Sequence, residues 1–448
     1  MTELARSTRL GPTGLAALLT LVTLNGAMAQ SASRTTSGDN PAQSQAMAQA
    51  PAGHETNEAA DPGGWPKISF DTVASLDYAR MSSSTGPNRG PGPVLWDDST
   101  FLAEFNDTVS LDGLFQFKPR EALASSNPNQ DLFINRGLNR KEGGKMKEFY
   151  VRYGDWRIGK FVQDFGRGYA LLPGPWASDF LEEPEQGYEP SDMVGVEKIH
   201  VSGDEEHGWK QLSLSAFMKD RTFLHASFPF NEGIVHYRDG GVGNTRLPEN
   251  AMATYDVLNA PLGHWGQTTY QASVIRWGKT YGTQRAEWWA TLGDDIAIPL
   301  RGSVEDTLRE HYSQLHLYVE GTRRWDFDGV AGQKRDFLSG SVEYLSGPWM
   351  FDLTTTQRWT SDNASLIRKD EIYAGTIAYA LPSQTVIALS AAHEKVGEEK
   401  GLYIGVRITQ AFALCSKCIA KGTRFLGSRS GNDAATSSRK GQPVGHAD

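Results

Sequence analysis

The chain has 448 residues, a formal net charge of −9 at pH 7 and a mean hydropathy of −0.45. The acidic balance argues against nucleic acid as a partner, and two cysteines are too few for a disulfide framework. The length fits two ordinary domains or one closed barrel of many strands. The 47 glycines, 12 tryptophans, 15 tyrosines and 19 phenylalanines favour the barrel, whose strands give only alternate residues to lipid.

The first residues predict export. Arg6 and Arg9 precede an apolar run over residues 14–24, which ends at the small-residue site Ala27-Met28-Ala29. This order is typical of a secretory signal peptide, so we expect residues 1–29 to be removed after Ala29. The run is too short for a spanning helix, and no other segment approaches about 18 consecutive apolar residues. A membrane protein with this sequence therefore crosses with strands.

Residues 30–66 are rich in Ala, Gln, Ser, Gly, Pro and Thr without an apolar period, which predicts a disordered leader. From Lys67 to Tyr78, apolar and polar residues alternate, which predicts a strand with two different faces. A loop rich in Ser, Gly and Pro is expected over residues 82–98. Residues 101–117 then form two strands around a turn at Asn106-Asp107, or one long strand.

A glycine turn at Gly154-Asp155 separates two alternating runs between Glu148 and Phe161, which is a strong hairpin signal. Long loops are expected over residues 119–144, 163–191 and 218–250. The remaining alternating segments predict strands near residues 193–201, 209–217, 251–258, 268–278, 285–298, 311–321, 336–344, 349–359, 371–381 and 385–394.

The last alternating segment, Leu402 to Phe412, carries apolar residues at even positions and Arg407 on its other face. An arginine face does not fit a dry core, so we interpret the segment as the closing strand of a barrel with a wet lumen. A soluble β-sandwich is the alternative, because its strands also alternate.

The expected architecture is an all-β, transmembrane antiparallel barrel of about sixteen strands over residues 67–412. If both chain ends lie in the periplasm, most short turns fall on the periplasmic side and the long loops fall outside, as in outer-membrane barrels. The connection near residues 299–308 is longer than its side predicts. Residues 413–448 carry a surplus of basic residues and are expected to form a disordered tail.

One region also resembles a known family. Residues 147–199 read KEFYVRYGDWRIGKFVQDFGRGYALLPGPWASDFLEEPEQGYEPSDMVGVEKI. They are similar to the block of Gram-negative outer-membrane porin-like proteins in which Gly-Lys precedes Phe-Gly and an acidic stretch. AFMKDRTFLHASF, at residues 216–228, and DGGVGN, at residues 239–244, resemble a loop of the same group. The resemblance is specific over about residues 148–249 and implies a barrel that passes small solutes. The family usually ends on a terminal aromatic residue, whereas this chain continues past Phe412.

The loop over residues 163–191 is the predicted constriction of the pore, because a barrel of sixteen strands is too wide for side chains to fill. Its glycines and prolines allow it to fold inward, and an acidic constriction favours cations. A solvated surface loop is the alternative. The residues assigned to this pore constriction are Asp164, Arg167, Asp179, Glu182, Glu183 and Glu185.

The polar phase of the strands predicts the lining of the lumen, where arginines facing an acidic loop would create a transverse field. Each residue could instead simply be solvated there. The predicted lumen-facing residues are Arg152, Arg157, Lys160, Lys198, His200, Arg276, Glu287, Gln314, His316, Glu320, Arg358 and Arg407.

The sequence gives only weak signals for a catalytic site or a metal-binding site. No G-x-S-x-G or H-E-x-x-H occurs, and a Ser313/His316 pair is the one hydrolase option that the sequence leaves open. Asp326-Phe327-Asp328-Gly329 lacks the closing glutamate of a calcium loop and is expected to form a polar turn. Cys415 and Cys418 have redox spacing without its context, so a local disulfide or two idle thiols is expected.

We therefore expect a porin-like channel for passive diffusion of small hydrophilic solutes, with a preference for cations left open, and with no cofactor, no metal and no enzymatic activity. The alternatives are a substrate-specific uptake barrel for an iron chelate or sugar, and a plugged structural or adhesive barrel. The expected partners are outer-membrane lipid and lipopolysaccharide, small hydrophilic solutes and the barrel-assembly machinery, with a homotrimer as one option and no nucleic acid.

Overall fold

The computed structural model describes residues 66–83, 89–118, 143–172, 187–204, 207–226, 234–301, 313–362, 366–381, 383 and 385–415. The expected signal peptide, the leader up to residue 65 and the tail from residue 416, with Cys418, lie outside these residues. Residues 413–415, expected to begin the disordered tail, instead continue the last strand.

The described chain is built from sixteen β-strands, the number that the sequence predicts. Their bounds are β1 Lys67–Ser83, β2 Arg89–Glu104, β3 Val109–Lys118, β4 Gly143–Tyr153, β5 Trp156–Lys160, β6 Met193–Asp204, β7 Gly208–Lys219, β8 Asn250–Pro261, β9 Gln267–Trp277, β10 Glu287–Arg301, β11 Ser313–Trp325, β12 Lys334–Ser346, β13 Trp349–Ser361, β14 Leu366–Ala380, β15 Thr385–Val396 and β16 Glu399–Cys415.

The helices are single turns in the connections. They are α2 Gly168–Leu171 and the 3-10 turns η1 Phe223–His225, η2 Tyr237–Asp239, η3 Gly263–Trp265 and η5 Phe327–Gly329. No helix in the described part of the chain is long and apolar enough to cross a membrane.

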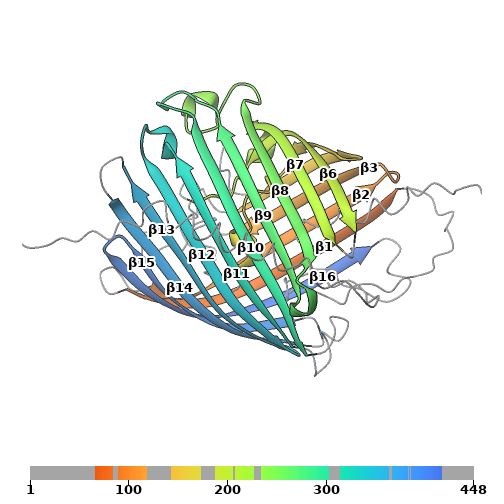
Figure 1. The fold of residues 1–448 in the computed structure, drawn as a ribbon, viewed down its shortest axis with the longest axis vertical. Coiled ribbons are helices and arrows are strands. Elements are labelled where there is room, and N and C mark those ends of the chain that lie inside the picture. Colours follow the sequence, from red (N-terminus) through yellow and green to blue (C-terminus); the bar gives the residue numbers. More distant parts are fainter. Residues whose placement is uncertain are drawn as a thin grey trace, which may run out of the picture.

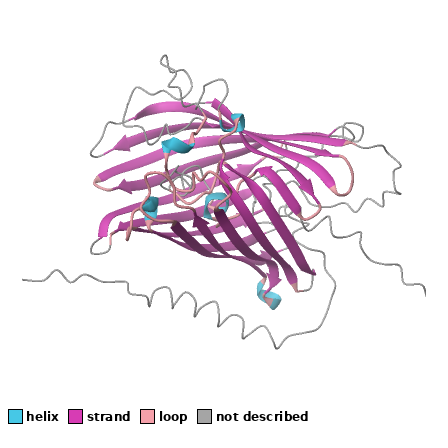
Figure 2. Ribbon diagram, turned by 90° about the horizontal axis from the view of Figure 1, so that it is seen from above, coloured by secondary structure: helices cyan, strands magenta, loops and turns pink. Residues whose placement is uncertain are grey.

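The sheet closes on itself, as Figures 1 and 2 show. Each strand pairs antiparallel with its sequence neighbours, and β1 pairs with β16 over a long register that sets Asp77 opposite Arg407. Closure pairs the two edges of the sheet with each other, so the described sheet has no edge strand that exposes unpaired backbone N–H and C=O groups to lipid. The fold is thus a closed, antiparallel, sixteen-stranded barrel.

The two rims of the barrel differ. One rim, here called the short-turn rim, carries tight connections such as Gly154-Asp155 and Gly347-Pro348. β1 begins and β16 ends at this rim. The other, the long-loop rim, carries the connections over residues 119–142, 161–192 and 220–249. This division agrees with the expected sorting of turns and loops. Most of the connection near residues 299–308 lies outside the described residues.

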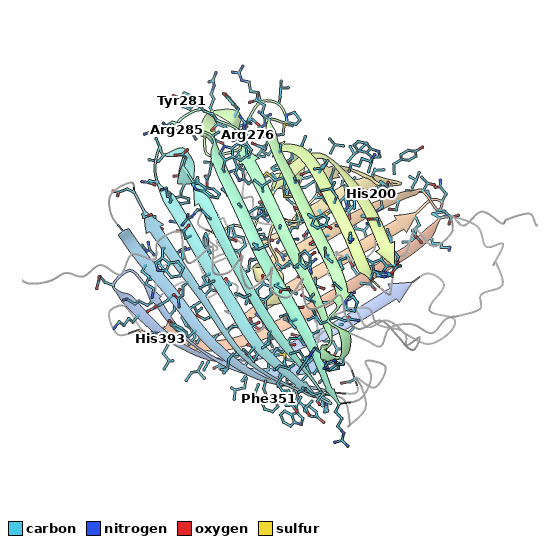
Figure 3. All side chains as sticks on the ribbon, viewed as in Figure 1. His200, Arg276, Tyr281, Arg285, Phe351 and His393 are labelled. Carbon is cyan, nitrogen blue, oxygen red and sulfur yellow. The ribbon has the colours of Figure 1, made fainter. Side chains whose placement is uncertain are left out.

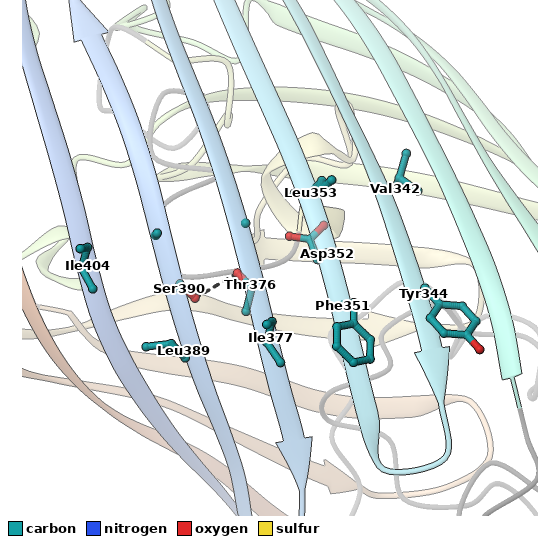
Figure 4. A pocket seen from close by; sticks show the side chains of 12 residues that line it. Val342, Tyr344, Phe351, Asp352, Leu353, Thr376, Ile377, Leu389, Ser390 and Ile404 are labelled. Atoms are coloured by element: carbon teal, nitrogen blue, oxygen red, sulfur yellow. Dashed lines mark hydrogen bonds between the residues drawn. The ribbon is translucent and has the colours of Figure 1, made fainter.

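Period-two alternation explains both faces of the wall. In β16, Leu402, Ile404, Val406 and Ile408 are exposed on the outside, whereas Arg407 points inward and binds the buried Asp77 through two hydrogen bonds. Leu353 on β13, 70% exposed, shows the same outward phase. Tyr344, Phe351, Leu353 and Ile377 line a hollow on the outer face of β12–β15 (Figure 4). An apolar exterior around a polar interior is the pattern of an outer-membrane barrel, so the protein is placed in that membrane.

The expected loop over residues 82–98 is wrong in most of its length, because β2 already begins at Arg89. Residues 89–96 pair with β1, but the pairing of β2 with β3 starts only at Asp97. Pro91 and Pro93 lie in this one-sided stretch, where a missing backbone N–H on the unpaired side costs no ladder hydrogen bond. The glycines and prolines that suggested a loop are thus those of a strand that, among the described residues, pairs on one side only.

Candidate functional site in the barrel lumen

The connection between β5 and β6, residues 161–192, is called the crossing segment below, and its described parts lie inside the barrel. Its described parts, residues 161–172 and 187–192, contact inward side chains of β7, β8, β9, β10, β11 and β12. Loop segments accordingly appear within the ring of strands in Figure 2. The described parts of the crossing segment therefore lie against the inner wall.

Glu320 on β11 anchors both halves of the crossing segment. Its carboxylate accepts hydrogen bonds from the backbone N–H of Arg167 at 2.6 Å and of Gly168 at 3.1 Å, and from the hydroxyl of Tyr188. Burial and the nearby carboxylate raise the pKa of Tyr188 well above its usual value, so the phenol remains a donor. One buried acid thus ties two points of the segment to the same strand.

A second set of contacts holds the segment to β8 and β9. The guanidinium of Arg167 lies 2.9 Å from the carboxylate of Asp256, which is buried on β8. Asp164 accepts a hydrogen bond from the amide of Gln271 at 3.1 Å, and its backbone carbonyl accepts one from Thr254 at 2.7 Å. The charge of Arg167 is therefore matched by the wall and does not face open water alone.

Aromatic rings fill the space between the crossing segment and the wall. Phe165 packs edge-on against Trp289, with ring centroids 5.6 Å apart, and Tyr188 packs against Phe337 at 5.0 Å. Trp277 continues the cluster at 4.9 Å from Trp289. These buried rings exclude water from the contact, which strengthens the hydrogen bonds beside it.

Lysines fix the point where the crossing segment returns to the wall. Asp192 lies 2.8 Å from the ammonium of Lys145 and 3.1 Å from that of Lys160, and Lys160 also pairs with Asp220 at 3.0 Å. Burial acts against ionisation of Asp192, but the two lysines outweigh it and lower its pKa well below the usual range. Glu189 likewise pairs with Lys147 on β4.

Only part of the predicted constriction can be placed. Asp164 and Arg167 lie inside the barrel in the contacts given above. Asp179, Glu182, Glu183 and Glu185 lie outside the described residues.

Several residues expected in the lumen have inward side chains. Arg152 and Arg157 lie directly opposite each other on β4 and β5, 3.8 Å from Asp112 and 3.4 Å from Glu197 respectively. Glu287 is buried and pairs with Arg324 at 2.6 Å. These arginines are accompanied by acids on the same wall, which weakens the transverse field expected from the sequence.

The others lie on β11, β13 and β16. Arg358 is buried and lies 2.9 Å from Asp370, Arg407 binds Asp77, and His316 is buried on β11 next to Glu343.

Lys198 and Arg276 are corrections, because both take the outward phase of their strands. Lys198 is exposed, with its ammonium 5.3 Å from the ring centre of the outward Trp156. Arg276 is exposed at the end of β9, donates to the carbonyl of Glu249, and lies on the outside of the barrel in Figure 3, as does His200. Arg276 is next to the last residue of β9, and Lys198, although in the middle of β6, is opposite Trp156, the first residue of β5 after the turn at Gly154-Asp155. Close to a rim, long basic side chains can reach the polar interface of the membrane, so the polar phase does not mark the lumen there.

Sequence reasoning missed the inward acids Asp256, Asp295, Glu343 and Asp352. Asp256, Glu343 and Asp352 stand between apolar outward neighbours, so consistent use of the alternation would have found them. Asp295 follows the outward Asp294, so alternation does not tell which of these two acids faces inward. Nothing in the sequence pairs Tyr188 with Glu320, which are 132 positions apart.

The remaining motifs add no chemistry within the described residues. Asp326 to Gly329 form the turn between β11 and β12, as expected. No group of three or more His, Cys, Asp or Glu residues among those described is arranged to hold a metal ion.

No family model matches the chain, and no curated protein matches it. Among solved structures, it is similar to the outer-membrane channel DcaP of Acinetobacter baumannii at 13% identity, with a TM-score of 0.48 over 78% of this chain and 97% of that one. It is also similar to OprB of Pseudomonas putida, at 9% identity and a TM-score of 0.46 over 78% and 94% of the two chains. An anion-selective porin from Comamonas acidovorans gives 9% identity and a TM-score of 0.45 over 78% and 100%.

Proposed function

We propose that the protein is an outer-membrane channel through which small hydrophilic solutes diffuse passively. A barrel of sixteen strands is too wide for its own wall side chains to fill. The observation that carries the proposal is that the described parts of the crossing segment are anchored to the inward side chains of the wall. A segment fixed to the wall from inside narrows a wide pore.

We further propose that the constriction favours cations. Arg167 and the lysines near the ends of the crossing segment are paired with acids of the wall or of the segment. The acids Asp179, Glu182, Glu183 and Glu185 then dominate the charge that the segment brings to the pore. Acidic rings in a pore attract cations and repel anions.

The test is the reversal potential across planar bilayers in a KCl gradient, for the wild type and for a Glu182→Gln, Glu183→Gln, Glu185→Gln variant. We expect the variant to conduct with a clearly reduced preference for K⁺ over Cl⁻. A Glu371→Gln variant is the control, because Glu371 pairs with Lys369 away from the segment. An unchanged ion preference refutes the acidic constriction, and the absence of any conductance refutes the channel.

A substrate-specific channel is the second candidate, because the lumen contains buried polar groups without protein partners, described in the next subsection. Single-channel recording separates the two candidates. A general pore conducts salt without interruption when solutes are added, whereas a specific one is blocked by its own solute.

As partners we propose membrane lipid and lipopolysaccharide around the apolar exterior, and the barrel-assembly machinery during insertion. A homotrimer is tested by cross-linking in intact envelopes, where a single band at the monomer position would exclude it.

A further inference from the structure

Four neighbouring inward residues on β10–β13 form what we call the acid–histidine row: Asp295, His316, Glu343 and Asp352. His316 lies directly opposite Glu343, and Glu343 directly opposite Asp352, across three adjacent strands. Asp295 stands at a diagonal position on β10, with its carboxylate 3.6 Å from Nδ1 of His316. Directly opposite residues in a sheet have Cβ atoms about 5 Å apart, so the row is continuous.

Glu343 and Asp352 are the two acids of the row to which the described residues offer no ion pair, whereas Asp295 lies beside His316. Both oxygens of the Asp352 carboxylate are also buried without a hydrogen-bond partner. Asp352 is only 4% exposed. Carboxylates buried without a cation or donor are costly, so such a group either takes up a proton or receives positive charge from a bound species.

Two further buried side chains point to a ligand. Neither ring nitrogen of His316 has a hydrogen-bond partner, and the histidine is 4% exposed. Thr354, the next inward residue after Asp352 on β13, is buried with its hydroxyl unpaired. Beyond Asp352 the polar line continues with Thr376 and Ser390, whose hydroxyls lie 3.0 Å apart (Figure 4). The row therefore holds unused donors and acceptors as well as negative charge.

An apolar shelf adjoins the row on the side of the short-turn rim: Leu345, Met350, Ala378, Val386 and Ala388, all buried. Leu345 and Met350 occupy the inward positions next to Glu343 and Asp352 on the same strands, and Ala378 lies opposite Met350. Acids beside an apolar surface suit a ligand with a charged head and a short hydrocarbon body.

We propose that the acid–histidine row and the apolar shelf form a subsite for an organic ammonium group that carries a short apolar body. A bare metal ion fits less well, because the described acids and histidine are not gathered as metal ligands. The ammonium donates to Glu343 and Asp352, and its hydrocarbon part lies on Met350 and Leu345. The inference deepens the proposed function, since the lumen is the route by which a solute reaches the row.

The test is calorimetric titration of the full-length protein, folded in detergent, with butylammonium, methylammonium, 1-butanol and Ca²⁺. We expect butylammonium to bind, methylammonium to bind more weakly, and butanol and Ca²⁺ to give no saturable binding. A Glu343→Gln, Asp352→Asn variant should bind butylammonium about tenfold more weakly or worse, since charge-assisted hydrogen bonds are lost. Met350→Ser should weaken butylammonium more than methylammonium.

Asp77→Asn is the matched control, because it removes one inward carboxylate elsewhere on the wall and should bind butylammonium like the wild type. Binding of Ca²⁺ in place of butylammonium, no binding at all, or equal binding by the double variant overturns the subsite. Circular dichroism of each variant verifies the fold. A protein that conducts without binding butylammonium refutes the subsite alone, whereas one that binds it without conducting refutes the channel alone.

Discussion

Two levels of the inner wall bury acids in opposite ways. At the level of the crossing segment, Glu320 receives three donors from the segment. In the acid–histidine row, Asp352 receives none from the described chain. The same strand, β11, contributes to both levels through Glu320 and His316. The difference teaches that burial alone does not reveal a role: an acid satisfied by its own chain holds structure, and an unsatisfied one marks a place for a ligand.

The largest expected effect is at the level of the crossing segment, here called the upper level; the acid–histidine row is called the lower level. Glu320→Gln keeps one acceptor but leaves a donor of the segment unpaired and removes the charge, which should lower the free energy of unfolding by about 2 kcal/mol. With its anchor weakened, the segment should also move, so single-channel current becomes larger and noisier. Denaturant unfolding in micelles and bilayer recording measure both effects. A variant as stable and as quiet as the wild type would show that the segment is held elsewhere.

The matched change in the acid–histidine row should alter the free energy of unfolding in the opposite direction. Glu343→Gln, Asp352→Asn replaces two buried acids, neither of them ion-paired among the described residues, with neutral amides, which should raise the free energy of unfolding at pH 7 by about 1–2 kcal/mol. The same denaturant titration in ligand-free buffer checks this. Destabilisation comparable to that of Glu320→Gln would mean that these acids have structural partners after all.

The smallest effect compares two threonines. Thr322 donates its hydroxyl to Thr291 at 2.8 Å at the upper level, so Thr322→Val should cost about 1 kcal/mol. Thr354 has no hydrogen-bond partner at the lower level, so Thr354→Val should leave stability unchanged or raise it slightly. Equal losses in the two unfolding titrations would remove the contrast between the levels.

Much of the barrel follows from alternation alone. In β16, Leu402, Ile404, Val406 and Ile408 face outward and Arg407 faces inward, as their positions predict. The number of strands also agrees with the prediction. The errors have local causes. Pro91 and Pro93 lie where β2 pairs with β1 alone among the described strands. Arg276 faces outward at the end of β9, and Lys198 faces outward opposite the first residue of β5. These exceptions depend on which strands pair beside a segment and on how deep a residue lies in the membrane, and the sequence of a single strand does not encode either.

The site was less predictable than the wall. The width of the barrel and the glycines and prolines of the connection after β5 favoured an inward fold over a solvated surface loop. Its anchor at Glu320 was not predictable, because it depends on a contact between residues far apart in the chain. The acid–histidine row arises only when the register of β11–β13 brings three separate inward positions together.

The contact between Tyr188 and Glu320 also orders events during biogenesis. The hydroxyl and the carboxylate are separated by 132 positions, so the entropy of a long loop must be overcome before they meet. A chain that still lacks β11 has no acceptor for the hydroxyl of Tyr188, so it cannot fix the position of the crossing segment in the lumen. The width of the passage is therefore fixed late, once the C-terminal half of the cylinder has joined the N-terminal half.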